Sequence, residues 1–232
     1  MKLLGIHFSV VRPVMLGSRG ITDFLIIMRP LSLRASPDNW QKFIARRLSA
    51  SFRSLAEKVW RRDRYTCQYC DFQAKDYMDV VNHDQDYSNN KASNLVTACG
   101  FCSQCFFLES IGLDDMSGGQ LIFLPEMSQE HLNSFCHVLF CAMSSKAAYQ
   151  DNAQIIYRHL KSRNKPIEDI LGEGGSDPRQ FGITMVQYQS LNEGKSLSPI
   201  LKDIRLLPLQ AKFNKQLEAW AHSATGVMEM LV

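Results

Sequence analysis

The feature that most constrains the fold of this chain is a pair of Cys-x2-Cys motifs in its middle third. The four cysteines are Cys67, Cys70, Cys99 and Cys102. Thiolates are soft ligands, and four of them in a tetrahedral arrangement fill the coordination shell of a structural zinc ion. In a reducing compartment, motifs with this spacing are more typical of metal sites than of disulfides. The sequence therefore predicts one structural zinc ion that holds residues 67–102 together.

One ligand assignment stays open on these motifs alone, because Cys105 forms a further Cys-x2-Cys motif with Cys102. We favour Cys99, because Asn94 precedes it by five residues, a spacing that matters for the motif described below. The chain has seven cysteines, an odd number that excludes complete disulfide pairing. Cys136 and Cys141 are expected to be unmetallated, since free cysteine is a common core residue.

Length and composition favour a folded protein without membrane spans. The 232 residues are 45% hydrophobic, which suits one large domain or one domain with a helical appendage. No stretch approaches the ~18–20 apolar residues of a membrane helix. His7 and Arg12-Pro13 interrupt the apolar run at the start of the chain, which argues against a signal peptide. The net charge of +3 is too small to indicate nucleic acid or membrane binding. We therefore expect a cytoplasmic protein.

An apolar stripe predicts one long helix in the N-terminal third. Ser36-Pro37 supplies a helix start, and the stripe runs to about Trp60. It consists of Trp40, Ile44, Leu48, Phe52, Leu55 and Val59. The segment from Arg34 to Arg64 also holds nine Lys/Arg against three Asp/Glu. A solvated helix face is the favoured interpretation, and a basic face for acidic partners is the alternative.

Around the cysteines the pattern predicts a ββα unit. Residues 64–73 have the form of a short hairpin whose turn holds the first two cysteines. Residues 77–83 read as a strand that ends at Asn82-His83. Ser93 can cap a helix that starts near Asn94. Hairpin, strand, loop and helix together predict an α+β fold with a central ββα zinc module.

The rest of the chain predicts one strand and several helices. Residues 120–126 form a strand stopped by Pro125, followed by a helix capped by Ser128 and a second helix around 147–162. The first of these helices is lined by Leu132, Phe135, Cys136, Leu139, Phe140 and Met143. A further helix begins at Ser198-Pro199 and is interrupted by Pro208. Phe213, Leu217 and Trp220 line the last one.

These patterns divide the chain into three parts. Residues 1–35 are expected to be an N-terminal extension, either disordered or an artefact of a start that belongs at Met28. Residues 36–170 hold the zinc-binding domain with its flanking helices. Residues 171–232 form a linker, beginning with GEGGSDP at 172–178, and a C-terminal helical segment.

The blocks RRDRYTCQYC, VVNH and SNLVTACGFC resemble an HNH endonuclease module with zinc knuckles. The resemblance implies that His83 stands at the general-base position and Asn94 at the motif asparagine. The two cation-ligand positions differ, because the family aspartate is Asn82 here and Ser103 follows the last knuckle cysteine. An amide brings no negative charge to a hard cation. His83 and Asn94 are therefore expected to be vestigial, and the protein is expected not to be an enzyme.

Two alternatives keep a role for nucleic acid. One is a metal-dependent HNH nuclease that uses His83 and Asn94, with Asp84 and Asp86 substituting as cation ligands. The other is a zinc-dependent nucleic-acid-binding protein. The acidity of Asp79, Asp84 and Asp86 counts against a DNA duplex lying over this site.

A longer resemblance covers residues 37–182. The blocks WRRDRYTCQYCDFQA, NHDQDYSNN, NLVTACGFCSQCFFLES, GGQLIFLPE, LNSFCHVLFCAM and IYRHL look like the IcmJ/DotN family of Dot/Icm type IVB secretion systems. The resemblance implies an HNH-like, zinc-containing, cytoplasmic subunit of the type IV coupling complex. Such a subunit binds the C-terminal extension of the VirD4-like coupling ATPase and joins adaptor subunits in recruiting effectors. It meets the inner membrane only through its partner, and nucleic acid is not expected.

Overall fold

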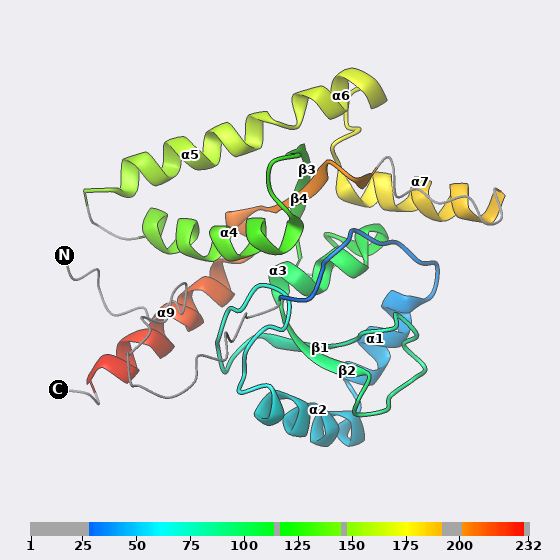
Figure 1. Cartoon of the computed structure of the whole chain (residues 1–232), viewed down its shortest axis with the longest axis vertical. Coiled ribbons are helices and arrows are strands. Elements are labelled where there is room, and N and C mark those ends of the chain that lie inside the picture. Colours follow the sequence, from blue (N-terminus) through cyan, green and yellow to red (C-terminus); the bar gives the residue numbers. More distant parts are fainter. Residues whose placement is uncertain (1–27, 114–116, 145–147, 192–200, 230–232) are drawn as a thin grey trace, which may run out of the picture.

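The computed structural model describes residues 28–113, 117–144, 148–191 and 201–229. Helices and two small antiparallel sheets confirm the expected α+β class (Figure 1). In chain order the elements are α1 (Asn39–Arg47), α2 (Ala50–Arg62), β1 (Met78–Asn82), β2 (Leu95–Cys99), α3 (Gly100–Ser103), η1 (Gln104–Phe106), η2 (Leu108–Ser110), β3 (Gly119–Phe123), α4 (Gln129–Ser144), α5 (Gln150–Ser162), α6 (Lys165–Leu171), α7 (Pro178–Leu191), β4 (Ile204–Pro208), η3 (Gln210–Lys212) and α9 (Asn214–Glu229).

The first sheet pairs β1 with β2, so that Met78 lies opposite Cys99 and Asn82 lies opposite Leu95. The strand expected at residues 77–83 is confirmed as β1. The helix expected to start near Asn94 is wrong, because residues 95–99 form β2 and the helix begins only at Gly100. Every residue of β2 is buried. A strand buried on both faces shows no alternation of polar and apolar residues, which is the usual signal of a strand.

The single long N-terminal helix is also wrong, because two helices, α1 and α2, share its apolar stripe. The stripe residue Leu48 is 80% exposed, and Ser49 after it has an extended backbone with ψ of 128°. Because of this break, the two helices pack against different parts of the molecule. Phe43 of α1 packs on the Phe107 ring, whereas Val59 of α2 belongs to a buried cluster with residues of β1 and β2.

The second sheet joins distant parts of the chain, since β3 pairs with β4. The helix expected before Pro208 is therefore wrong at residues 204–208, while Ser198-Pro199 lies outside the described residues. The side chain of Gln129 in α4 bonds both backbone groups of Leu206, donating to its oxygen and accepting from its N–H. The predicted strand β3 and helices α4, α5 and α9 are confirmed. Helices α6 and α7 were not predicted.

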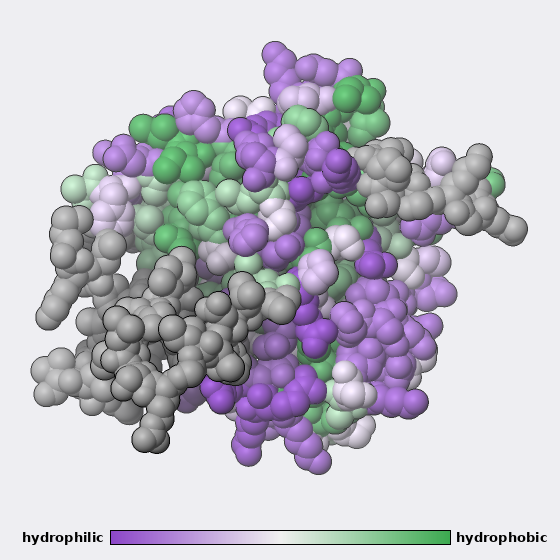
Figure 2. All heavy atoms as spheres, viewed as in Figure 1, coloured by the Kyte–Doolittle hydropathy of each residue, from purple (hydrophilic) through white to green (hydrophobic). Residues whose placement is uncertain are grey.

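Helix α4 runs between the two sheets, with α5 and α6 beyond it and α9 beside it (Figure 1). Hydrophilic side chains gather over α1 and α2, and hydrophobic ones over α4 and α5 (Figure 2). Within the N-terminal segment, Leu31 and Leu33 are buried, and Arg34 exchanges backbone bonds with Cys105 and Leu108. Residues 1–27 lie outside the described part, and the domain boundaries stay a prediction. Among the described residues, no helix is both long and apolar enough to cross a bilayer.

Candidate metal centre

The first two cysteines lie in a tight turn closed by a single bridge between Thr66 and Gln73, which is the predicted hairpin. The Cys67 N–H donates to the Phe72 oxygen over 2.8 Å, and the Asp71 N–H donates to the Cys67 oxygen over 3.0 Å. Asp71 has a φ of 61°, a left-handed conformation that aspartate tolerates better than most residues. The backbone thus folds back so that both sulfurs face the same side.

The second pair spans the junction of a strand and a helix. Cys99 is the last residue of β2, and Cys102 lies in the single turn of α3. Backbone pairing brings the first turn against this strand, because the Gln68 N–H donates to the Thr97 oxygen over 2.9 Å. Because Thr97 is two residues before Cys99, this contact fixes the two cysteine pairs side by side.

The four cysteines expected to bind metal come together in one cluster. The Sγ atoms of Cys67, Cys70, Cys99 and Cys102 all lie within 4.8 Å of one another, and those of Cys70 and Cys99 are 3.5 Å apart. A tetrahedral zinc ion with Zn–S bonds of ~2.3 Å requires sulfurs about 3.8 Å apart. All four residues are at most 1% exposed, and all seven cysteines of the chain are free. Geometry and donor type therefore fit a tetrahedral thiolate site.

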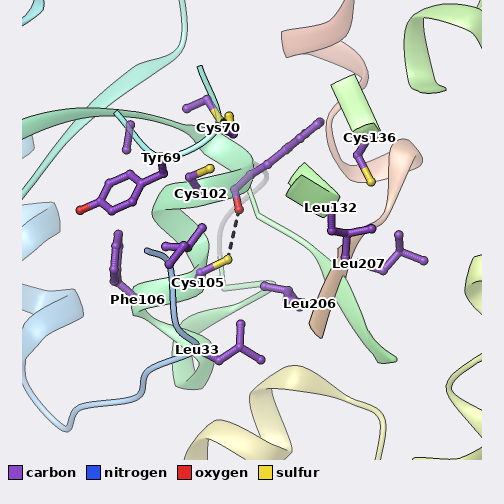
Figure 3. Close-up of a cluster of buried hydrophobic side chains, with 14 of the residues drawn as sticks. Leu33, Tyr69, Cys70, Cys102, Cys105, Phe106, Leu132, Cys136, Leu206 and Leu207 are labelled. Carbon is purple, nitrogen blue, oxygen red and sulfur yellow. Dashed lines mark hydrogen bonds between the residues drawn. The ribbon is translucent and has the colours of Figure 1, made fainter. Parts of the chain in front are cut away.

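Cys105 does not belong to this cluster, although it forms a Cys-x2-Cys motif with Cys102. Its sulfur instead donates to the Phe101 oxygen over 3.3 Å. Figure 3 shows the Cys70 and Cys102 side chains together and Cys105 with its own hydrogen bond. Cys136 is also buried, on α4, and burial raises the pKa of both thiols. Neutral core cysteine is the role that these observations support for both residues.

Two side chains of α4 contact the cluster, and neither was among the residues predicted to belong to the site. Asn133 Nδ2 lies 3.3 Å from Cys102 Sγ, and His137 Nε2 lies 3.3 Å from Cys99 Sγ. The signal was an Asn and a His four residues apart, next to Leu132 and Cys136 on an apolar helix face. Polar residues at such positions are usually hydrogen-bonded when they are buried.

The cluster favours one thiolate even before an ion is considered. Burial raises the pKa of the Cys67 thiol, but hydrogen bonds from Cys102, Cys70 and Cys99 outweigh it and leave this pKa well below its usual range. Burial dominates in the other three and raises their pKa values. Burial also lowers the pKa of His137 to about 3, against the opposing charge of Cys67.

The two residues that the HNH resemblance singles out, His83 and Asn94, lie at the other end of the same sheet. His83 directly follows β1 and is exposed, and its N–H donates to the Asn94 oxygen over 2.8 Å. Its ring Nδ1 is 3.5 Å from Arg29 Nη1. The Asn94 side chain closes the intervening loop, because Nδ2 donates to Asp84 Oδ1 over 2.8 Å and Oδ1 accepts from the Asp84 N–H over 3.0 Å.

Asn82 and Ser103 stand where the HNH resemblance places cation ligands, and both are bonded to protein groups. Asn82 is fully buried, accepts a hydrogen bond from Arg46 Nη1, and donates to the backbone oxygens of Asp86 and Asn89. Ser103 Oγ donates to Asp79 Oδ2 over 2.7 Å.

The Arg46 guanidinium is buried beside this end of the sheet. It lies over the rings of Phe52 and Tyr87, 4.5 and 4.7 Å from their centroids. Burial lowers the pKa of Arg46 to about 10, so the side chain remains cationic at neutral pH. The guanidinium therefore supplies a fixed positive charge next to Asn82.

Comparison with known proteins decides the family. No family model matches the chain. It is 52% identical over 194 residues to a protein of Legionella pneumophila subsp. pneumophila named Type 4 apparatus protein DotN. The match covers 84% of this chain and 90% of the relative. The chain belongs to the DotN family. The resemblance to IcmJ/DotN found in the sequence is thereby confirmed, and it extends over nearly the whole length of the DotN relative.

Proposed function

We propose that this chain is a non-enzymatic subunit of a Dot/Icm type IVB secretion apparatus. Its zinc-stabilised, HNH-like scaffold presents a surface that binds the C-terminal extension of the coupling ATPase and helps to recruit effectors. The observation that carries this proposal is the 52% identity to DotN over most of both chains. At that level of identity, the fold and the main interaction surfaces are expected to be shared.

A single structural zinc ion held by the four clustered cysteines is the first part of the proposal. The cluster is buried, its sulfurs lie within 4.8 Å of one another, and each Cys-x2-Cys pair is shaped by its own backbone turn. When bound, such an ion supplies folding free energy and takes no part in a reaction. Because its ligands would be buried cysteines from two turns that are distant in the sequence, the role of the zinc ion is structural.

The HNH-like assignment of the scaffold rests on the order of its elements. Two antiparallel strands are followed by a short helix, with His83 just after β1 and Asn94 just before β2. Those are the places that the HNH resemblance gives to the general base and to the motif asparagine. The hydrogen bond between the His83 N–H and the Asn94 oxygen joins the two positions across the mouth of the loop.

The surroundings of these residues support a scaffold without catalysis. A hard cation requires oxygen ligands with free lone pairs and, in most sites, negative charge. Asn82 brings no negative charge, its oxygen already accepts from the Arg46 guanidinium, and its nitrogen binds two carbonyl groups. A buried cation beside residue 82 also disfavours a second, metallic one by Coulomb repulsion.

Location and partners follow from membership in the apparatus. The chain is expected on the cytoplasmic side of the inner membrane, attached through the ATPase and its companion subunits. Its own contacts would be protein contacts, and nucleic acid is not part of the proposal.

Calorimetric titration tests the proposal directly. The zinc-loaded full chain is titrated with the C-terminal extension of the coupling ATPase from the same genome. We expect saturable one-to-one binding, and no plasmid cleavage when Mg²⁺ or Mn²⁺ is supplied. Absence of binding at concentrations of about tens of micromolar, weaker than about −6 kcal/mol, would withdraw the coupling-complex role. Plasmid cleavage that is lost in His83→Ala would instead support the nuclease alternative.

A further inference from the structure

Helix α4 reaches the cysteine cluster with two polar side chains that have no part in the proposed metal coordination itself. Asn133 is 0% and His137 is 3% exposed, so neither side chain is there to meet solvent. Each places a nitrogen 3.3 Å from a different sulfur, Asn133 on Cys102 and His137 on Cys99. Both contacts therefore fall on the second Cys-x2-Cys pair, at the junction of β2 and α3.

The orientation of the Asn133 amide is fixed by its other bonds. Its Oδ1 accepts a hydrogen bond from Gln129 Nε2 over 2.9 Å, and its Nδ2 also donates to the Phe101 oxygen over 3.1 Å. Exchanging the two ends of the amide would place its oxygen against a carbonyl oxygen and a sulfur. The N–H group of Asn133 must therefore face Cys102.

The His137 ring is held just as firmly, between two aromatic rings of the cysteine turns. It stacks on Phe72 with centroids 3.6 Å apart and an interplanar angle of 4°, and on Phe101 at 4.2 Å and 20°. Phe72 follows the first Cys-x2-Cys pair, and Phe101 lies within the second. This double stack leaves the ring little freedom except to aim Nε2 at Cys99.

The net charge of a zinc site with four thiolates explains why hydrogen-bond donors are needed beside it. A zinc ion with four thiolates carries a net charge of −2, which is costly in a protein core unless hydrogen bonds offset it. On the second pair, side-chain donors come from α4, a separate element about thirty residues further along the chain.

We propose that Asn133 and His137 are positioning residues of the zinc site, whose N–H groups donate to the metal-bound thiolates of Cys102 and Cys99 and slow the loss of the ion. Zinc then also anchors α4, because the same donors hold this helix against the cysteine turns. Gln129, in the first turn of α4, carries the link on to Leu206 in the second sheet. The inference rests on the zinc ion of the proposed function.

The test uses the substitution His137→Phe in the full-length protein, which keeps an aromatic ring between Phe72 and Phe101 but removes the N–H donor. Zinc transfer to a chromophoric chelator is followed in time, and the sulfur-to-metal charge-transfer band is recorded after Co²⁺ substitution. We expect zinc release to be ~10–100-fold faster than in the wild type, the usual effect of losing such a partner. The charge-transfer band should move to longer wavelength, because an unbonded thiolate holds its electrons less tightly. His159→Phe, on the exposed face of α5, should change neither value.

Each result has a distinct meaning. A folded His137→Phe variant with unchanged release rate and an unchanged band overturns the inference, because a purely structural role would leave the band in place. If His137→Phe does not fold, Asn133→Leu removes the donor to Cys102. The zinc release rate and the charge-transfer band of that variant then test the inference in the same way. A wild-type protein that holds neither zinc nor cobalt would instead contradict the zinc site itself, and this inference with it.

Discussion

The two ends of the β1–β2 sheet hold the two groups of residues on which the HNH resemblance rests. The two groups differ in the metal ligands that they offer. Cys99 pairs with Met78 at one end, where all four sulfurs come together in the core. Asn82 pairs with Leu95 at the other end, where the expected carboxylate is an amide. One end holds four clustered thiols that suit a soft metal, and the other has an amide where a hard metal would need a carboxylate.

At the Asn82 end, side chains that could otherwise bind a cation are hydrogen-bonded to other protein groups. Around Asn82 the polar groups are bonded to each other: Arg46 to Asn82, Asn82 to the loop backbone, and Asn94 to Asp84. Buried polar groups are stable only when they are paired in this way. The comparison therefore predicts that substitutions at the cysteine end abolish metal binding, whereas those at the Asn82 end alter stability and no chemistry.

Removing one clustered cysteine should have the largest effect. In Cys99→Ser or Cys67→Ser, we expect loss of zinc and an unfolded or aggregated module. Structural zinc contributes ~10–16 kcal/mol of apparent binding free energy in small modules, comparable to the ~5–15 kcal/mol total stability of a domain. Zinc content per chain and far-ultraviolet circular dichroism measure both consequences. Normal melting with full zinc content in either variant would contradict the ligand assignment.

Cys105→Ser is the matched control, because Cys105 is an equally buried neighbour outside the cluster. A serine hydroxyl can still donate to the Phe101 oxygen. This variant should retain one zinc ion and lose no more than about 1–2 kcal/mol of unfolding free energy.

Arg46→Met should cause the next largest effect, now at the Asn82 end. The substitution keeps apolar contact with Phe52 and Tyr87 but removes the donor to Asn82 Oδ1, Asn90 Oδ1 and the Val80 oxygen. Leaving such acceptors unpaired should lower the unfolding free energy by about 3 kcal/mol, with zinc content unchanged. Urea unfolding at saturating zinc measures this loss of unfolding free energy. Arg53→Met on the exposed face of α2 should stay within about 0.5 kcal/mol, and an equal loss there would remove the special role of Arg46.

Asn82→Asp tests whether the carboxylate of the HNH motif, placed at residue 82, gives the protein nuclease activity. We expect no Mg²⁺-dependent plasmid cleavage and a loss of about 1–3 kcal/mol in unfolding free energy. A carboxylate can accept from Arg46, but it cannot donate to the Asp86 and Asn89 oxygens that the amide now binds.

Asn90→Asp is the matched control for this substitution. Its side-chain oxygen also accepts from Arg46 but is exposed, so a carboxylate there should leave stability equal or slightly higher. Cleavage activity in Asn82→Asp, or a gain in its stability, would contradict the proposal that the hydrogen bonds around Arg46 and Asn82 have a structural role only.

The contrast between the two ends also explains which features the sequence could predict. The cysteine cluster was predictable because ligand type and spacing are local properties of the chain. The strand β2 was not, since LVTAC is buried on both faces and a serine before it imitates a helix cap. The strand β4 depends on pairing with β3, about eighty residues earlier, and no local pattern carries that information.

Buried polar side chains were the hardest to assign. The sequence pattern favours a solvated basic face for Arg46, but in the structure its side chain is buried against Phe52, Tyr87 and Asn82. Asn133 and His137 could have been noticed as two polar residues beside an apolar stripe. Their partners, however, are sulfurs more than thirty residues away, and only the fold brings them together.

His83→Ala should have the smallest effect, and it separates a catalytic residue from a scaffold most sharply. Its side chain is exposed, and its bond to Asn94 uses the backbone N–H, which alanine keeps. We expect the unfolding free energy to change by less than about 0.5 kcal/mol, and binding of the ATPase extension to stay unchanged. Asn94→Ala should cost more, about 1–2 kcal/mol, because its amide holds Asp84 and the Asn89 oxygen. Urea unfolding of both variants, with a plasmid assay alongside, measures this order. The reverse order, with cleavage by the wild type that His83→Ala abolishes, would show that the Asn82 end still works as an active site.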